Sequence, residues 1–308
     1  MDKEKSIDVS ASIGRYINEN APVIKYTKKD VDELIASIGS DGLSVMKDAG
    51  MYDGDPETLY VASTFCGGTG LNEKVDDDFL VDFYSNVKKL DAADFLSNPY
   101  VSAVRYKEVR CGKLFLAYSK YVPGELFQYD MPDFDKRLVV PKIGFFTEEV
   151  RFPTIYEGNM PWMSVCPSET STIDPYIEKA SGNVLVLGLG LGYYPFRIAE
   201  LEKVNKIVIV EINYGIIDLF KKNVFPFFPH KEKYEFVCAD AVAFLKELPN
   251  DGRYDYCFAD IWEGVLDGLK FYDAIKEQEE RLTATKFGYW IEPQLKAFKK
   301  YRGKTENE

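Results

Sequence analysis

The spacing of apolar residues changes near residue 165, and the change divides the chain into two parts. After that point, short runs rich in apolar residues alternate with segments of helical spacing. The runs cover residues 184–187, 206–210, 234–238, 254–259 and 286–291. Such runs are typical of strands that are covered on both faces, as in a parallel sheet. Regular alternation of strand and helix predicts a right-handed, doubly wound α/β sheet with helices on both faces.

The first part of the chain has a mixed pattern. Residues 28–38 have helical spacing behind Thr27, a candidate N-cap, and residues 76–96 predict one helix or a helix pair. Short runs rich in β-branched and aromatic residues then predict antiparallel hairpins. These runs cover residues 101–106, 113–121, 126–129, 137–140 and 143–148.

Two domains follow from these patterns. We expect a mixed helical and β-hairpin region over residues 1–165, which covers the ligand cleft, and a Rossmann-like domain over residues 166–308. The chain of 308 residues is long enough for both.

A glycine-rich turn follows the first apolar run. Gly188, Gly190 and Gly192 stand at alternate positions, and residues 194–201 then have helical spacing. Glycine permits sharp turns and lets a ligand approach the backbone closely. Unpaired N–H groups and the positive end of the helix dipole collect at a helix N-terminus. A tight turn without a ligand is the alternative, but the acidic residues described below favour a nucleoside.

The spacing of these glycines excludes two common motifs. No Lys-Ser or Lys-Thr follows, as a P-loop requires. The dinucleotide motif G-x-G-x-x-G would place its last glycine at Tyr193. The remaining pattern, G-x-G-x-G, resembles the first motif of class I S-adenosylmethionine-dependent methyltransferases and the related spermidine synthases. This resemblance spans about residues 166–292. It implies a methyltransferase-type sheet and S-adenosylmethionine as cofactor, held by these glycines and Tyr193.

Acidic residues stand at the ends of three successive predicted strands. Glu211 lies 19 residues after Gly192, where an acid can accept hydrogen bonds from both ribose hydroxyls. Asp240 ends the third strand, where the resembled families hold the adenine amino group. Asp260 ends the fourth strand, beside the reacting centre in many members of those families. A single acid at a strand end is usually a helix cap, but three favour a ligand site at the carboxyl edge of the sheet.

We expect the catalytic residues at the end of the fourth strand. Asp260 and Glu263 are the candidates, with Trp262 beside them and Tyr193 and Tyr194 across the cleft. An apolar pocket of this kind would exclude water. The alternative is that Asp260 only caps the following helix.

Glu169 is a further candidate, in a hydroxyl-rich segment at residues 168–172. In the resembled families the segment before the first strand often lies over the cofactor. The alternative is a plain linker, with Asp174 as the N-cap of a helix that starts at Pro175.

The sequence departs from the resembled families at several points. Val186 replaces the acid that methyltransferases usually carry two residues before the first glycine. Leu191 replaces the aspartate with which spermidine synthases hold the aminopropyl amine. His230 is the only histidine, so no tyrosine–histidine pair for a polyamine is visible. The usual final antiparallel hairpin is missing, so the sheet is either short or completed by N-terminal strands.

Three functions remain open. The first is methyl transfer from S-adenosylmethionine to a small-molecule acceptor, with Asp260 deprotonating or orienting the nucleophile. The second is aminopropyl or aminocarboxypropyl transfer, which Leu191 disfavours. The third is non-catalytic nucleoside binding, since Val186 removes one ligand contact. The identity of the acceptor and the formation of a homodimer are left open.

Composition and charge exclude several other classes. A net charge of −12 and an isoelectric point near 4.8 disfavour nucleic acid as a partner. A basic cluster at the C-terminus is read as a solvated helix end. It consists of Lys296, Lys299, Lys300, Arg302 and Lys304. Five scattered cysteines and one histidine predict neither a disulfide framework nor a metal site. We see no membrane-length apolar run and no signal peptide, so a cytoplasmic protein is expected.

Two shorter motifs are read as local structure. Residues 66–70, C-G-G-T-G, predict a loop because neither a lysine nor an apolar helix follows. Asn98-Pro99-Tyr100 is similar to the N-P-P-Y motif of amino-methyltransferases, but it lacks one proline and precedes the glycine loop. We interpret it as a proline turn that leaves a helix.

Overall fold

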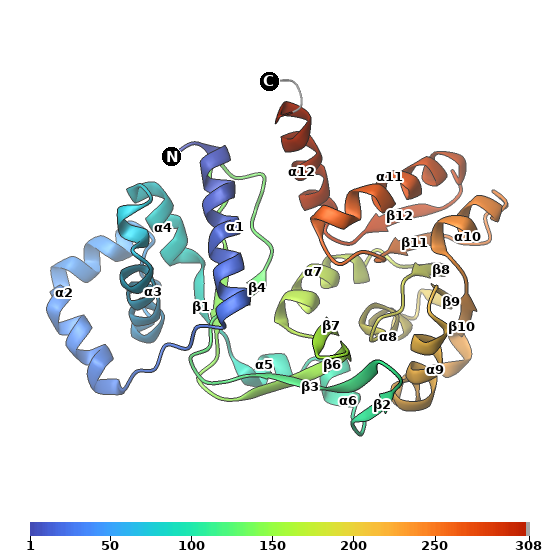
Figure 1. Ribbon diagram of the computed structural model, residues 1–308, viewed down its shortest axis with the longest axis horizontal. Coiled ribbons are helices and arrows are strands. Elements are labelled where there is room, and N and C mark those ends of the chain that lie inside the picture. Colours follow the sequence, from blue (N-terminus) through green and yellow to red (C-terminus); the bar gives the residue numbers. More distant parts are fainter. Residues whose placement is uncertain (306–308) are drawn as a thin grey trace. The chain divides into compact units, whose positions relative to one another are not determined.

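The computed structural model describes residues 1–305, and the side chains of residues 1–301, in two compact units (Figure 1). The first unit is formed by Met1–Leu96 and Lys120–Arg151, and the second by Ser97–Ser119 and the chain from Phe152 onward. Residues 97–119 and 152–165 thus belong to the same unit as the parallel sheet. Independent folding of residues 166–308 remains a prediction.

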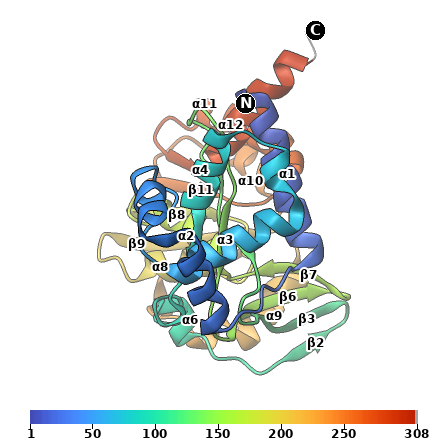
Figure 2. The same cartoon turned by 90° about the vertical axis from the view of Figure 1, so that its left-hand side faces the viewer.

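The first unit combines helices with a small sheet. Its helices are α1 (Lys3–Asn20), α2 (Lys28–Asp48), α3 (Pro56–Thr69), α4 (Asp77–Asn86) and α5 (Ala92–Leu96), with a 3₁₀ turn at Leu71–Glu73. Figure 2 shows α1 to α4 facing the viewer. The strands β1 (Val87–Lys89), β5 (Lys142–Phe145) and β4 (Phe127–Asp130) pair in that order. Thr27 caps α2 as predicted: its hydroxyl accepts from the Asp30 N–H, and the Asp30 carboxylate accepts from the Thr27 N–H.

Three local predictions in the N-terminal part were wrong. Residues 66–69 form the last turn of α3, and Gly70 is its left-handed cap at φ 63°. Residues 101–103 belong to a short helix, α6 (Pro99–Ala103), which Asn98 caps through the Tyr100 N–H. Residues 137–140 form no strand. In α3 the burial of an apolar face, which includes Leu59 and Ala62, outweighs the low helix propensity of glycine.

A five-stranded parallel sheet forms the centre of the second unit. Its strands are β8 (Gly182–Leu187), β9 (Val204–Glu211), β10 (Tyr234–Cys238), β11 (Tyr256–Ala259) and β12 (Lys286–Tyr289). The order is β10-β9-β8-β11-β12, and every pairing is parallel. All five apolar runs are therefore confirmed as strands of one doubly wound sheet. The strand order reverses between β8 and β11, which is where such sheets bind ligands.

Helices cover both faces of this sheet. Right-handed crossovers place α8 (Tyr193–Ala199) and α9 (Tyr214–Asn223) on one face and α10 (Ala241–Glu247) and α11 (Val265–Arg281) on the other (Figure 1). Two further helices are α7 (Pro167–Ile177) and α12 (Glu292–Thr305), and 3₁₀ turns form at Phe225–Phe227 and Lys231–Lys233. Within the described chain the sheet ends at β10 and β12, so no N-terminal strand completes it.

A separate four-stranded sheet leads into the parallel one. Strands β2 (Val109–Cys111), β3 (Leu114–Tyr121), β6 (Val150–Glu157) and β7 (Met160–Ser164) lie side by side in that order. The last two pair as an antiparallel hairpin, and β7 runs directly into α7. The sequence did not predict β6 or β7, yet β7 supplies residues of the site described below.

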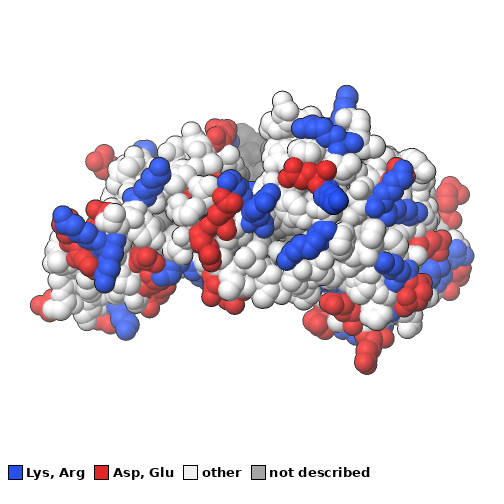
Figure 3. Space-filling model, turned by 90° about the horizontal axis from the view of Figure 1, so that it is seen from below, with Lys and Arg blue, Asp and Glu red and all other residues white. Residues whose placement is uncertain are grey.

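Basic and acidic side chains are interspersed on the face drawn in Figure 3. In the predicted basic cluster, Lys296 pairs with Glu292 and Lys299 with Asp273. The side chains of Arg302 and Lys304 lie outside the described residues. No helix in the described part of the chain is both long and apolar enough to cross a membrane.

Tyr100 connects α6 to the glycine-rich turn after β8. Its side chain has no exposed surface, and its hydroxyl donates to the Leu191 carbonyl oxygen at 2.5 Å. Its ring meets Phe196 edge-on at a centroid distance of 5.3 Å and Phe228 at 6.2 Å. The Asn98-Pro99-Tyr100 motif, which the sequence analysis interpreted as a proline turn, therefore supports the glycine loop through Tyr100.

We expect Tyr100→Ala to lower the free energy of unfolding by about 3–5 kcal/mol, because it leaves a cavity among these rings. Tyr100→Phe keeps the ring and should cost only about 1–2 kcal/mol, from the Leu191 carbonyl that loses its donor. Urea unfolding measures both values, with Tyr214→Ala as the exposed control. Equal losses for the two Tyr100 variants would contradict the assigned packing role.

Candidate functional site

The glycine loop is a tight backbone turn at the end of β8. Gly188, Gly190 and Gly192 have φ values of 96°, 50° and 75°, which residues with a side chain rarely adopt. A β-carbon at position 188 would lie 2.0 Å from the Asp260 carbonyl oxygen. One at position 190 would lie 1.8 Å from the Met163 sulfur. At position 188 the close contact is to backbone, so space as well as φ requires glycine there, whereas at position 190 the contact is to the flexible Met163 side chain and φ is the stronger reason.

Glu211 ends β9 and faces the glycine loop. Its side chain is 8% exposed. One carboxylate oxygen accepts from the Leu189 N–H at 3.2 Å and the other from the Asn213 N–H at 2.8 Å. A carboxylate offers about four lone-pair positions, so each oxygen can still accept another hydrogen bond. The backbone thus holds Glu211 in a fixed orientation with acceptor capacity left for a ligand.

One cavity collects most of the residues that the sequence predicted. It has a volume of about 530 Å³ and lies at the carboxyl edge of the parallel sheet. This size is in the usual range for small-molecule sites. Its walls include Gly188, Gly190, Glu211, Asp240, Asp260 and Glu263. Gly192, Tyr193 and Tyr194 line a smaller adjoining cavity instead.

Asp240 both caps a helix and lines the cavity. One carboxylate oxygen accepts from the Ala243 N–H at 2.7 Å and so caps α10. The same side chain lines the cavity. The helix-cap interpretation is thus correct for Asp240, and its second oxygen is still able to accept from a ligand.

Asp260 does not cap the helix that follows it. The first turn of α11 is capped by Asp267, which accepts from the N–H groups of Glu263 and Gly264 at 3.0 and 2.9 Å. Glu263 itself is exposed, whereas Asp260 lies inside the cavity. The structure therefore leaves the Asp260 carboxyl available for chemistry.

Glu169 faces Asp260 across the same cavity. Among the described residues neither carboxyl has a hydrogen-bond or ion-pair partner. Burial raises the pKa of Asp260 to about 7. Burial, together with the negative charge of Asp260, raises the pKa of Glu169 to about 8. Two desolvated acids with shifted pKa values in one cavity indicate a functional site.

Glu169 lies on a helix that begins earlier than the sequence suggested. The helix α7 starts at Pro167, with Cys166 in the N-cap position, and continues through Pro175. The prediction that Asp174 caps a helix at Pro175 was wrong, because Pro167 already supplies the favoured first position. The segment over the cavity is therefore helical and presents Glu169 from its first turn.

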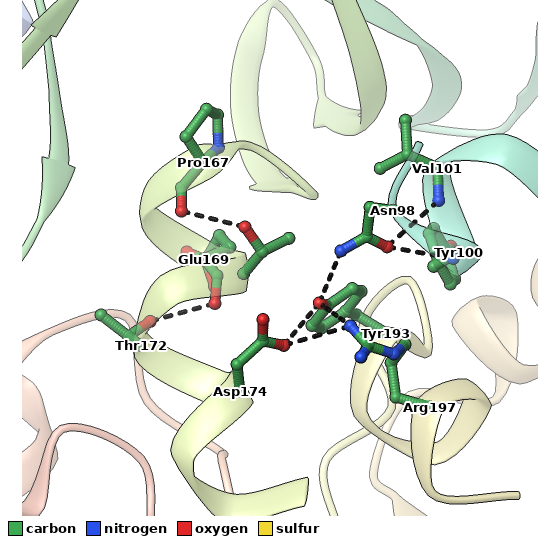
Figure 4. Close-up of polar contacts among 10 residues, drawn as sticks. Asn98, Tyr100, Val101, Pro167, Glu169, Thr172, Asp174, Tyr193 and Arg197 are labelled. Atoms are coloured by element: carbon green, nitrogen blue, oxygen red, sulfur yellow. Dashed lines mark hydrogen bonds and ion pairs between the residues drawn. The ribbon is translucent and has the colours of Figure 1, made fainter. Parts of the chain in front are cut away.

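The Tyr193 hydroxyl makes three hydrogen bonds to other side chains (Figure 4). It donates to Asp174 at 2.6 Å and accepts from Asn98 at 2.9 Å and Arg197 at 2.6 Å. The network joins α7 and α8 to α6, which is far from both in the sequence. Since the Tyr193 side chain is only 4% exposed, its evident role is to hold α7 and the glycine loop together.

The remaining walls are aromatic and acidic. All three tryptophans of the chain, Trp162, Trp262 and Trp290, line the main cavity together with Phe271. Six acids line it and, among the described residues, no lysine, arginine or histidine does. The acids are Glu169, Glu211, Asp240, Asp260, Glu263 and Asp267. In the described chain no three His, Cys, Asp or Glu side chains converge as a metal ion would require.

Sequence reasoning missed Trp162 and Met163, because the strand that carries them had no clear alternating pattern. It named Glu169 only as a secondary candidate, since nothing in the sequence places α7 opposite β11.

The comparisons with known proteins agree with this fold. Residues 175–277, about a third of the chain, match the model of the spermine/spermidine synthase domain. This match and the strand order both agree with the predicted methyltransferase-type sheet. A search of curated proteins gives no match.

Solved structures give weaker similarity. A spermidine synthase from Thermotoga maritima is 14% identical, over 61% of this chain and 56% of its own, with a TM-score of 0.34. A spermidine synthase in complex with the transition-state analogue AdoDATO is 13% identical, over 60% and 57%, also at 0.34. The 23S rRNA methyltransferase ErmE is 21% identical, over 37% and 42%, at 0.29. The chain thus spans about half the length of the structures it matches.

The two cavity acids should make stability depend on pH in a specific direction. Their pKa values are raised by folding, so the folded protein keeps protons that the unfolded chain releases. Their contribution to the free energy of unfolding is full below about pH 4 and is lost as the pH rises through 7 to 8. We therefore expect Asp260→Asn to gain stability over the original protein by on the order of 2 kcal/mol more at pH 8 than at pH 5.

Urea unfolding at several pH values measures this difference, and Glu169→Gln should behave in the same way. Glu19→Gln, an exposed position on α1, is the control and should show no such trend. A constant difference between Asp260→Asn and the original protein across this range would contradict the shared burial of the two acids.

Proposed function

We propose that the protein transfers a methyl group from S-adenosylmethionine to a small acceptor bound in the main cavity. One observation carries the proposal. A single cavity has the glycine loop, Glu211 and Asp240 among its walls together with two carboxyls, Asp260 and Glu169, that have no partner among the described residues. In this proposal the groups that would bind a nucleoside and the groups that would accept a proton line the same cavity.

The donor groups on the walls fit the nucleoside part of this cofactor. Glu211 is suited to the ribose hydroxyls, because its oxygens keep acceptor capacity after binding the Leu189 and Asn213 N–H groups. Asp240 is suited to the adenine amino group through the oxygen that does not cap α10. Gly188 and Gly190 let the ligand approach the loop backbone.

The bound cofactor would supply an activated methyl group on its sulfonium, so the protein has to position the acceptor and manage one proton. Asp260 is the group that accepts this proton from an acceptor N–H or O–H. Its pKa of about 7 is near the value at which a general base works well at neutral pH. Glu169 places a second carboxyl within electrostatic reach of Asp260, and the tryptophans exclude water.

The wall chemistry favours a cationic or neutral acceptor over an anionic one. Six acids and no described basic side chain create a negative potential that repels phosphate and carboxylate groups. Aromatic faces attract cations as well as apolar groups. This supports a small-molecule acceptor and disfavours nucleic acid.

Aminopropyl transfer is the second candidate. It is favoured by the spermine/spermidine synthase domain match and by the lack of a described basic side chain in the cavity that would bind a cofactor carboxylate. Against it, the loop position of the aspartate that holds the aminopropyl amine is Leu191, which is apolar and buried. Decarboxylated S-adenosylmethionine lacks that carboxylate, so its affinity separates the two candidates.

Calorimetric titration tests the ligand directly. We expect S-adenosylmethionine to bind, and NAD to bind far more weakly. Glu211→Ala should weaken nucleoside binding about tenfold to a hundredfold, because it removes charge-assisted hydrogen bonds worth about 1.5–3 kcal/mol.

Because Glu211 also holds the loop, circular dichroism should show that each variant is folded. Glu211→Gln keeps one acceptor oxygen and should give an intermediate affinity. Glu247→Ala, an exposed acid on α10, should bind like the original protein. Unchanged affinity in Glu211→Ala would reject this nucleoside site, and tighter binding of decarboxylated S-adenosylmethionine would favour aminopropyl transfer.

Once an acceptor is found by screening amines and neutral nucleophiles, Asp260→Asn should lower kcat by roughly a hundredfold or more. It should leave the affinity for S-adenosylhomocysteine unchanged, since Asp260 is assigned to the acceptor. Glu263→Gln, at the exposed mouth, is the matched comparison and should have a smaller effect. Full turnover in Asp260→Asn would transfer the role of base to Glu169.

A further inference from the structure

The side chain of Met163 lies directly on the glycine loop. Its sulfur accepts a hydrogen bond from the Leu191 N–H at 3.2 Å. A β-carbon on residue 190 would lie 1.8 Å from this sulfur and 2.6 Å from the Met163 methyl carbon. The thioether therefore fills the space that the missing side chain of Gly190 creates.

Met163 also lies at the junction of the two cavities. It lines the main cavity and the smaller adjoining cavity, both of which include Gly188, Gly190, Glu169 and Asp260. The part of the loop that a ligand could approach through Gly190 is thus covered by a side chain of the protein itself.

A ligand can replace the hydrogen bond between the Leu191 N–H and the Met163 sulfur. A thioether sulfur is a weak hydrogen-bond acceptor, so an oxygen of a ligand would be a better partner for the Leu191 N–H. Methionine has three rotatable side-chain bonds and adapts to several shapes at low cost. Met163 belongs to β7, an edge strand whose pairing with β6 shifts register between Ile155 and Tyr156. The edge position leaves one side of β7 without a neighbouring strand.

We propose that Met163 is a gate on the nucleoside site: its thioether covers Gly190 and the Leu191 N–H and must leave before a ligand contacts that part of the loop. This inference rests on the proposed function, because the ligand is the nucleoside of that proposal. The gate lowers the apparent affinity by the fraction of molecules in which the loop is uncovered. If Met163 covers the loop in nine of ten molecules, the apparent Kd is about tenfold above that of an open site.

Calorimetry with S-adenosylhomocysteine as the probe tests the gate. Met163→Ala removes the covering group and should tighten binding several-fold, up to about tenfold. Met163→Leu keeps similar bulk over Gly190 and should stay close to the original affinity. Met160→Ala lies on the same strand but is exposed, so it is the matched control and should change nothing.

The outcomes separate the gate from the proposed function. Tighter binding in Met163→Ala, or binding seen only in that variant, supports both. Measurable binding in the original protein with equal or weaker binding in Met163→Ala overturns the gate, makes Met163 a wall of the site, and leaves the proposed function standing. Absence of binding in every protein overturns the proposed function and the gate together.

A second measurement checks the contact without any ligand. Gly190→Ala adds a β-carbon at φ 50° and should lower the unfolding temperature in both backgrounds. The loss should be larger when Met163 is present than in Met163→Ala, because only the first protein has the steric clash. Equal losses in the two backgrounds would show that Met163 does not cover the loop in solution, and would overturn the gate.

Discussion

The close approach of backbone segments at the end of β8 is the constraint on which the site depends. Gly188 lies against the carbonyl of Asp260, so the loop after β8 and the end of β11 pack without room for a side chain. This contact joins the two strands at which the sheet order reverses. Because parallel strands end at the same edge, Glu211, Asp240 and Asp260 lie around one cavity at this point.

The supports of the loop come from distant parts of the chain. The Tyr100 hydroxyl donates to the Leu191 carbonyl oxygen, the Tyr193 hydroxyl bonds with Asn98 and Asp174, and Met163 covers Gly190. Three segments outside the parallel sheet, β7, α6 and α7, therefore fix the geometry of a motif that lies within it. Such preorganised support is what a ligand site requires of its surroundings.

The two cavity acids show the cost of placing charge in an enclosed space. Neither Glu169 nor Asp260 has a protein partner among the described residues, and burial raises the pKa of both. As the pH rises through 7 to 8 the folded protein loses stability from carboxyls held in this way, because each proton that leaves exposes an unpaired buried charge. Their arrangement is understandable if a bound substrate completes the electrostatics of the cavity.

Sequence patterns were enough to predict the parallel sheet, the glycine loop and the acids at three strand ends, because these depend on local spacing and on the rule that parallel strands end together. They did not determine that Asp267 caps α11 in place of Asp260, that α7 starts at Pro167, or that β7 exists. Nor did they show that Glu169 faces Asp260, or that Tyr100 and Met163 contact the loop. The last three points depend on tertiary packing, because each is a contact between segments that no local pattern of residues relates.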